Sequence, residues 1–268
     1  MLKTIITALV LFSFLACSTS NKTTRNMKFA DNTVVAHRGA FKKNGLPENS
    51  IASLKEAIRL KCTGSEFDVR MTADDSLIIN HDPHYNKLDI EKTTYQNLLA
   101  FKLSNGEKLP TLQEYLSAGL NNNPSTRLIV EIKPSVISKE RGKLIADKVV
   151  AMIRAMKAEK MVAYISFDYD MLKHIHQIEP TAITQYLNGE IAPQQLSIDG
   201  ISGADYHYSV FKKNPGWIAE AKQYKIQLNA WTINEPADMD WLLKESFDFI
   251  TTNEPELLLD KKKNVGNK

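Results

Sequence analysis

The chain has 268 residues, of which 43% are hydrophobic and 24% are charged. This is the composition of an ordinary globular protein, and the length suits one large domain or two small ones. The formal charge at pH 7 is +3. So small a positive excess predicts no nucleic-acid partner, because nucleic-acid binders concentrate basic residues in a patch.

The first residues have the pattern of an export signal. Met1-Leu2-Lys3 gives a positive start, and an apolar run without charge extends from Ile5 to Ala16. A run of this length is typical of a secretory signal peptide over residues 1–16 and is short for a membrane span. The segment ends in Phe14-Leu15-Ala16-Cys17, which resembles the lipobox of bacterial lipoproteins.

The lipobox resemblance implies that Cys17 carries lipid and anchors an exported protein to a membrane, facing the periplasm or the cell surface. The polar stretch 17–32 is then a flexible tether. Ordinary secretion of a soluble protein, with Cys17 incidental, is the alternative. If Cys17 is lipidated, Cys62 has no disulfide partner and the fold must rely on its hydrophobic core.

From residue 33 onward, short β-rich runs alternate with helical patterns. The predicted strands end at His37-Arg38, Asp68, Lys133, Phe167, Leu187, Tyr206, Thr232 and Thr252. Helical patterns cover residues 49–62, 94–101, 110–115, 139–158, 169–178, 193–196, 215–224, 236–246 and 255–261. Eight strand-then-helix units predict a single (β/α)8 TIM barrel over 33–260, with a small insertion at 83–127 and a basic tail at 261–268.

The stretch 66–82 is predicted to be a strand, a four-residue turn and a returning strand. So short a link cannot make a parallel crossover, so this pair must form an antiparallel hairpin outside the parallel barrel. Pairing Thr72 with Leu77 then places Asp68 opposite His81.

Three carboxylates come from the predicted strand ends. Glu66 and Asp68 are two residues apart and share one face of a strand. Together with Glu131 they can hold one hard cation, Mg²⁺ or Ca²⁺, through oxygen. A zinc site is disfavoured because the sequence has no Cys-x-x-Cys and no His-Glu-x-x-His.

Two histidines and two cationic side chains accompany the acids. His37 and His81 can act as base and acid at a phosphorus centre, because imidazole titrates near neutral pH. Arg38 and Lys133 can bind phosphate oxygens. This combination is suited to phosphodiester cleavage rather than to hydride or acyl transfer.

At these positions the sequence resembles the glycerophosphodiester phosphodiesterase family. The matching motifs are His37-Arg38-Gly39, Pro47-Glu48-Asn49-Ser50, Glu66-x-Asp68, His81-Asp82, Glu131-Ile132-Lys133, Ser166-Phe167, Trp231-Thr232 and Thr252-Asn253-Glu254-Pro255. The resemblance spans about residues 34–255. It implies a (β/α)8 barrel and metal-dependent hydrolysis of a glycerophosphodiester to sn-glycerol 3-phosphate and an alcohol.

The resemblance also implies a role for each matching residue. The metal ligands are Glu66, Asp68 and Glu131, and the catalytic acid–base pair is His37 and His81. The phosphate contacts are Arg38 and Lys133. Glu48 matches an acid near the metal or the glycerol, and Trp231 matches an aromatic residue that packs on the glycerol side.

Two other functions remain open on the sequence. A related barrel phospholipase of the C or D type would act on lipid head groups, and a long apolar rim at the barrel mouth would favour it. A non-catalytic lipoprotein that binds phosphodiesters is the third possibility, although the complete set of acids and histidines argues against it. Glu131 and Lys133 can also pair with each other, and this pairing is compatible with both of their predicted roles.

Overall fold

The structure is a computed structural model that describes residues 28–266. The predicted signal peptide, Cys17 and most of the predicted tether lie outside these residues. Among the helices of residues 28–266, none combines the length and the hydrophobicity that crossing a bilayer requires.

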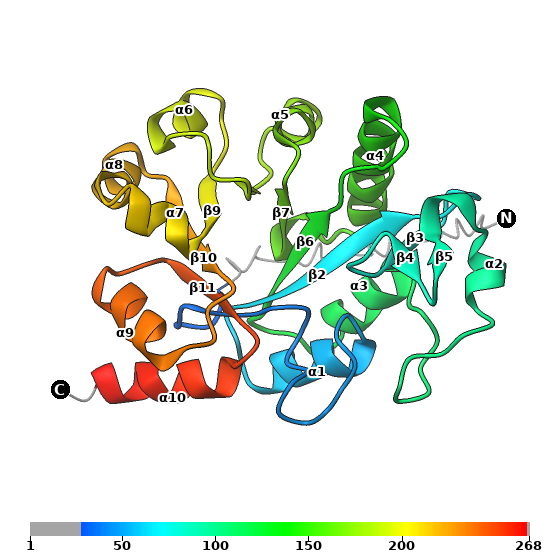
Figure 1. Cartoon of the computed structure of the whole chain (residues 1–268), viewed down its shortest axis with the longest axis horizontal. Helices are drawn as coiled ribbons and strands as arrows, with labels where there is room; N and C mark the ends of the chain where they lie inside the picture. Colours follow the sequence, from blue (N-terminus) through cyan, green and yellow to red (C-terminus); the bar gives the residue numbers. More distant parts are fainter. Residues whose placement is uncertain (1–27, 267–268) are drawn as a thin grey trace, which may run out of the picture.

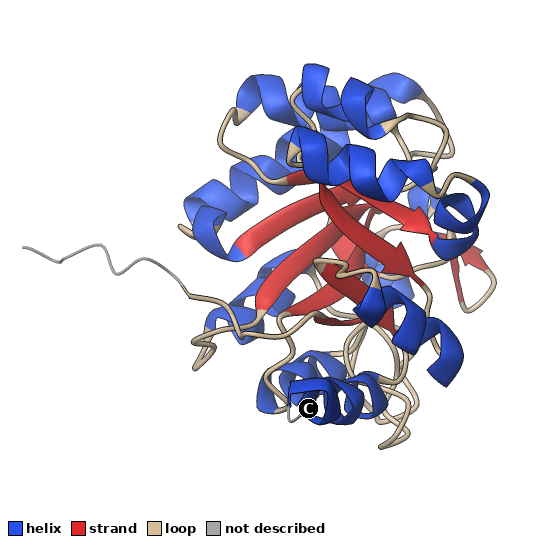
Figure 2. Ribbon diagram, turned by 90° about the vertical axis from the view of Figure 1, so that its left-hand side faces the viewer, coloured by secondary structure: helices blue, strands red, loops and turns tan. Residues whose placement is uncertain are grey.

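Eight parallel strands form a closed barrel that is surrounded by helices (Figures 1 and 2). In chain order they are β1 (Val34–Ala36), β2 (Gly64–Met71), β6 (Arg127–Ile132), β7 (Val162–Ser166), β8 (Thr184–Tyr186), β9 (Gly203–His207), β10 (Gln227–Trp231) and β11 (Phe249–Thr252). Each strand pairs with the next along this series, and β1 pairs with both β2 and β11, which closes the ring. The prediction of a (β/α)8 barrel is confirmed.

A helix follows each barrel strand. The helices are α1 (Ile51–Arg59), α2 (Tyr95–Leu98), α3 (Leu112–Leu120), α4 (Lys139–Ala155), α5 (Tyr169–Ile178), α6 (Pro193–Ile198), α7 (Tyr208–Lys213), α8 (Gly216–Tyr224), α9 (Pro236–Lys244) and α10 (Pro255–Gly266), with short 3-10 turns η1 (Ile90–Lys92) and η2 (Glu159–Met161). The sequence pattern does not indicate α7. The last helix continues five residues beyond its predicted end, and Lys261 in it pairs with Asp240.

Strand alternation separates two packing layers. Val34 and Ala36 on β1 point outward into the large core between the barrel and its helices. Val35 points inward, where it packs with Ile129 and Ile165 in a small apolar plug inside the barrel. The interior above this plug, toward the carboxyl ends of the strands, is left for polar side chains.

The returning strand β3 (Leu77–Ile79) is antiparallel to β2 and pairs with no other barrel strand, as predicted. Its predicted register is wrong by one residue, because Met71 rather than Thr72 pairs with Leu77. Asp75 adopts a left-handed conformation with φ 61°, and the main-chain amide of Thr72 donates to the carbonyl of Ser76 at 2.9 Å. The loop is therefore three residues long, a length that uses a left-handed residue at its end.

The insertion after β3 is small. It contains a second hairpin, β4 (His84–Tyr85) and β5 (Leu88–Asp89), followed by η1, α2 and α3. Glu91 in η1 is buried and accepts hydrogen bonds from the Ser135 hydroxyl at 2.6 Å and from the Arg141 guanidinium at 2.9 Å. The insertion therefore holds the loop that follows β6, which carries Lys133 at its start.

Candidate active site

A cavity of about 110 Å³ opens at the carboxyl ends of the barrel strands, the end at which active sites of this architecture lie. Its lining has two chemically different sides. The charged side consists of His37, Arg38, Glu66, His81, Glu131 and Lys133. The opposite side includes Ile165, Phe167, Leu187 and Trp231, from β7, β8 and β10.

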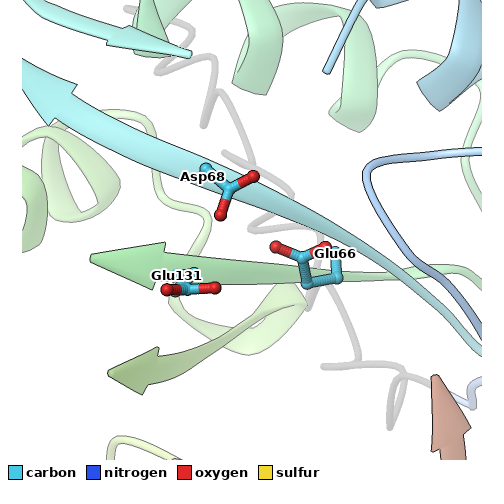
Figure 3. Close-up of side chains that lie close together, drawn as sticks. All are labelled: Glu66, Asp68 and Glu131. Atoms are coloured by element: carbon cyan, nitrogen blue, oxygen red, sulfur yellow. The ribbon is translucent and has the colours of Figure 1, made fainter. Parts of the chain in front are cut away.

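The three predicted metal ligands lie together on two neighbouring strands. Glu66 and Asp68 project from β2 and face Glu131 on β6 (Figure 3). All three are buried, and one carboxylate oxygen of each lies within 4.8 Å of the others. Burial, together with the negative charges of Asp68 and Glu131, raises the pKa of Glu66 well above its ordinary value. Burial and the charge of Asp68 also raise the pKa of Glu131, to about 7.

These three carboxylates fit a divalent cation. Oε1 of Glu66 is buried, and no described residue hydrogen-bonds to it. Three acids this close repel one another, and oxygen ligands at such spacing suit a hard cation.

Lys133 is buried between two of the acids. Its Nζ lies 2.8 Å from Oδ1 of Asp68 and 2.5 Å from Oε1 of Glu131. Burial alone would raise the pKa of Asp68, but the positive charges of Lys133 and His81 and the hydrogen bond from Asn49 hold it below its ordinary value. From the sequence, Lys133 was expected either to bind phosphate or to pair with Glu131, and the two roles are compatible. The structure contains the pair with Glu131.

A tight turn after β1 brings the main chain of Arg38 onto the acid cluster. Arg38 has φ 53° and Gly39 has φ 80°, so two successive residues are left-handed. A Cβ on Gly39 would lie 2.4 Å from Oγ of Ser53, so only glycine fits there. The turn points the Arg38 amide at Glu66, to which it donates at 2.8 Å.

Asn49 clamps the second acid. Its side-chain amide donates to Oδ2 of Asp68 at 2.7 Å, and its side-chain oxygen accepts from the Asp68 main-chain amide at 3.2 Å. The main-chain amide of Asn49 donates to the carbonyl of Arg38 at 3.0 Å. Ser50, not Asn49, caps helix α1, and this leaves the Asn49 side chain free for Asp68.

The two histidines have different hydrogen-bond partners. Nδ1 of His37 lies 2.7 Å from the side-chain oxygen of Asn253, and Nδ1 of His81 lies 2.7 Å from a carboxylate oxygen of Asp82. Burial and the charge of Arg38 lower the pKa of His37 to about 4. His81 is the more open of the two, with 36% of its side chain exposed against 19% for His37.

His81 is held in place through its main chain. The register shift places Asn80 rather than His81 opposite Asp68, with the Asn80 amide donating to the Asp68 carbonyl at 3.0 Å. His81 therefore lies beyond the end of β3, in irregular structure. Nε and an Nη nitrogen of Arg70 both donate to its carbonyl, at 2.8 and 2.7 Å, and the imidazole still lines the cavity.

The remaining predicted residues are Trp231 and Glu48. Trp231 lines the cavity, packs edge-on against Phe167 with ring centroids 5.7 Å apart, and donates its indole N–H to the Asp205 carbonyl at 2.9 Å. Glu48 is 46% exposed and pairs with the Arg38 guanidinium at 2.9 Å. Glu48 lies outside both the carboxylate cluster and the cavity lining.

Four further residues contribute to the site although the sequence did not single them out for it. Asn49 and Asn253 lie in the quoted motifs, where their roles as partners of Asp68 and His37 could have been suspected. Arg70 and Asp205 lie on β2 and β9 with no motif to mark them. Strand alternation could have indicated both, because Arg70 shares the inward face of Asp68, and Asp205 is an acid in a short buried strand.

The cavity chemistry and the fold together define a barrel hydrolase of phosphoric diesters, and comparison with known proteins gives the family. The model of the glycerophosphoryl diester phosphodiesterase family matches residues 37–257. The chain belongs to this family.

Individual relatives agree over nearly the whole fold. A crystal structure of a glycerophosphodiester phosphodiesterase from Parabacteroides distasonis is 39% identical with a TM-score of 0.84, covering 87% of this chain and 98% of that one. The glycerophosphodiester phosphodiesterase of Caldanaerobacter subterraneus subsp. tengcongensis is 26% identical over 242 residues, 85% of this chain and 96% of its own length. A phosphodiesterase from Oleispira antarctica, solved with its product sn-glycerol-3-phosphate, shares the fold at 21% identity with a TM-score of 0.74, covering 85% of this chain and 96% of that one.

Proposed function

We propose that this protein hydrolyses glycerophosphodiesters to sn-glycerol 3-phosphate and an alcohol, with one Mg²⁺ or Ca²⁺ ion held by Glu66, Asp68 and Glu131. The observation that carries the proposal is the meeting of this acid cluster with two imidazoles and two cationic side chains in one cavity. Relatives across the family bear the same activity in their names, and the Oleispira antarctica enzyme was solved with this product.

The cavity provides the groups that a phosphodiester needs. When bound, the cation supplies positive charge that stabilises the non-bridging oxygens of the phosphate. Arg38 lies beside the acid cluster, with Nε of its guanidinium 3.6 Å from Oδ2 of Asp68. Lys133 lies on the other side, between Asp68 and Glu131. Both side chains can donate to phosphate oxygens that lie above the acids.

The partners of the two histidines favour distinct roles. Carboxamide and carboxylate oxygens only accept hydrogen bonds, so Nδ1 of each ring carries a hydrogen and Nε2 is left for proton transfer. Burial and the charge of Arg38 lower the pKa of His37 to about 4 and keep it uncharged, as a general base must be, although the hydrogen bond with Asn253 acts in the opposite direction. The hydrogen bond to Asp82 orients the ring of His81, and with His37 as the base the role of general acid falls to His81.

In this scheme His37 takes a proton from the attacking group at phosphorus, and His81 gives a proton to the departing alcohol. The attacking group is either water or the 2-hydroxyl of the substrate's own glycerol, which would pass through a cyclic phosphate. Both routes place the attacking and departing oxygens on opposite sides of the phosphate, near different imidazoles.

The function is tested by release of glycerol 3-phosphate from glycerophosphocholine, with and without a chelator. Activity that is lost with the chelator and restored by Mg²⁺ or Ca²⁺ is expected. Activity indifferent to the chelator would exclude the metal-dependent mechanism, and absence of hydrolysis on any diester would favour a binding protein.

The histidine roles are tested with His37→Ala and His81→Ala. Each should reduce turnover of glycerophosphocholine by about 10²–10⁴-fold. A p-nitrophenyl diester needs no general acid, because its leaving group is stable as an anion. On this substrate the turnover of His81→Ala should therefore recover far more than that of His37→Ala. The reverse pattern would exchange the roles, and near full activity in either variant would remove that histidine from the mechanism.

A second candidate, cleavage of lipid head groups, has one observation in its favour. Val136 and Ile137, in the loop after β6, are 64% and 54% exposed. Phe167, directly after the neighbouring strand β7, is 37% exposed. These three give the barrel mouth an apolar edge. A higher kcat/KM on lysophosphatidylcholine than on glycerophosphocholine, abolished by changing both Val136 and Ile137 to Ser, would favour this candidate.

We also propose that the protein is exported and anchored through Cys17. The support is the sequence of residues 1–17, with its positive start, apolar run and lipobox-like end. The protein should fractionate with membranes, and Cys17→Ser should release it. A Cys17→Ser variant that stays with the membrane would refute lipid attachment at this residue.

A further inference from the structure

Asp205 is a buried acid of the active-site cavity to which the mechanism above gives no role. It lies on β9, is 1% exposed, and lines the cavity. Its Oδ1 is buried, and no described residue donates a hydrogen bond to it. A buried carboxyl oxygen without a donor costs free energy, and such groups in native proteins are rare enough to require an explanation.

The neighbours of Asp205 leave its Oδ1 without a donor, although a contact with the Asn229 side chain opposes the rise in the pKa of this carboxyl that burial and the charge of Glu131 cause. Asn229, its partner on β10, exchanges hydrogen bonds with the Thr251 hydroxyl at 3.0 and 3.2 Å. The indole N–H of Trp231 is used by the main-chain carbonyl of Asp205 at 2.9 Å. Leu187, directly after β8, follows the paired residues Tyr186 and Ala204, so it lies beside Asp205, and its side chain offers only hydrocarbon.

Asp205 is also the acid on the otherwise apolar side of the cavity. The expected position of the phosphate is next to Glu66 on β2, Glu131 on β6 and Lys133 directly after β6, across the barrel from β9. The organic group attached to the phosphate must therefore extend toward β7–β10. There it meets apolar and aromatic side chains, with the Asp205 carboxyl among them.

We propose that Asp205 is a specificity-determining residue that accepts a hydrogen bond from a hydroxyl of the polyol bound at this site. The inference rests on the proposed function, which brings a glycerol phosphate into the cavity. A hydroxyl needs only one acceptor and leaves nothing unpaired when it donates to Oδ1. The ammonium group of an ethanolamine ester carries three donors, and Leu187 and Ile165 offer no acceptors for the other two.

The test is calorimetric binding, which needs no turnover. Wild-type protein, in buffer with Mg²⁺ and in buffer with Ca²⁺, is titrated with sn-glycerol 3-phosphate and with propyl phosphate, which lacks both hydroxyls. The titrations are made at pH 9, because burial and the charge of Glu131 raise the pKa of Asp205 to about 8. A buried hydrogen bond to the charged carboxylate then predicts about 10- to 150-fold tighter binding of glycerol 3-phosphate. In Asp205→Ala the two affinities should agree within about twofold, because the acceptor is gone.

Two controls keep the result interpretable. Asp248→Ala removes an acid at the opposite end of the barrel, where it accepts from the Leu228 amide, and should keep the wild-type ratio. The thermal midpoint of Asp205→Ala should lie close to that of wild type, because the variant loses a contact with Asn229 but also removes a buried oxygen that has no donor. A large fall would show that Asp205 stabilises the fold instead, and would overturn the proposal.

Other outcomes separate the inference from the proposed function. If Asp205→Ala keeps the wild-type preference for glycerol 3-phosphate, the hydroxyl contact is refuted even when glycerophosphocholine is hydrolysed. If wild-type protein shows the preference and the variant loses it, the contact stands even without hydrolysis. Phosphoethanolamine and ethyl phosphate form a second pair, and an effect of the variant confined to that pair would overturn the hydroxyl assignment.

Discussion

Removing the cation should make the protein's stability fall as the pH rises, and the cause is Glu131. Its pKa is raised from the ordinary 4.5 to about 7 by burial and by the charge of Asp68. Without a cation, the folded state therefore holds a proton on Glu131 that the unfolded state has released. The free energy of unfolding should decline as the pH rises from about 4.5 to about 7 and should then level off.

The size of this effect follows from the shift. Each pKa unit corresponds to about 1.4 kcal/mol, so Glu131 alone accounts for a loss of about 3 kcal/mol between the two ends of the window. For a chain of this size, about 2–4 °C of the thermal midpoint corresponds to 1 kcal/mol. The expected decline is therefore roughly 6–12 °C. Glu66 and Asp205, whose pKa values are also raised, add to the decline in the same direction, so the wild-type decline exceeds the share of Glu131.

His37, in the same cavity, changes the free energy of unfolding in the opposite direction over part of this pH range. The pKa of His37 is lowered from 6.5 to about 4 by burial and by Arg38. The unfolded state therefore binds more protons at this histidine, and its contribution to stability increases as the pH rises from about 4 to 6.5. A variant that removes only the Glu131 carboxylate is needed to separate the two.

The assay is the thermal midpoint between pH 5 and pH 8, with a chelator and with saturating Mg²⁺ or Ca²⁺, for wild type and Glu131→Gln. The decline in chelator should be present in wild type, shallower in Glu131→Gln, and unchanged in the exposed control Glu159→Gln. Cation binding requires ionised ligands, so the stabilisation by cation should grow with pH. A wild-type profile in chelator that matches that of Glu131→Gln would refute this electrostatic account of the cluster.

Three further substitutions test the groups that position the site. Asn49→Ala removes both side-chain hydrogen bonds to Asp68 and should weaken cation affinity by about 10–100-fold, measured by calorimetry; an unchanged affinity would contradict the clamp. Arg70→Met removes two donors from the His81 carbonyl and should lower kcat by at least about tenfold with little change in KM, whereas equal changes in both would indicate a role in substrate binding. Gly39→Ala forces a side chain into a contact under 3 Å at a positive φ and should destabilise the fold by about 2–4 kcal/mol, and a denaturation midpoint equal to wild type would contradict that crowding.

The barrel was predictable because its signals are local and repeated. Most of the barrel strands are short runs rich in apolar residues, and polar residues at or near their ends mark the carboxyl end of the strand. Closure of a parallel barrel brings these ends together, so Glu66, Glu131 and His37 could be placed at one mouth from chain order alone. The identity of the residues at the strand ends then gave the chemistry.

The hairpin register was not predictable to the residue, because it depends on one backbone conformation. A four-residue and a three-residue loop have the same turn-like composition, and only the left-handed Asp75 separates them. The error in the predicted register does not remove His81 from the site, because His81 lies beyond the end of β3 and is positioned by Arg70 rather than by strand pairing. The long side chain of Arg70 reaches the His81 carbonyl in the observed register. A sequence pattern does not predict a contact of this kind.

The partners of the reactive groups show why the acid cluster is compatible with a stable fold. Glu66 and Asp68 are rigid because they lie on β2, but burial leaves both in need of donors. The loop after β1 supplies these donors through the Arg38 amide and the Asn49 side chain, and Arg38 and Asn49 are joined by a main-chain hydrogen bond. Asp205 differs from these acids, because it lies on β9, across the barrel from β2, and its Oδ1 receives no hydrogen bond from any described residue. Under the proposed function, the donor-free oxygen of Asp205 is best explained by a hydroxyl of the ligand, whereas that of Glu66 lies among three clustered acids and is explained by a cation.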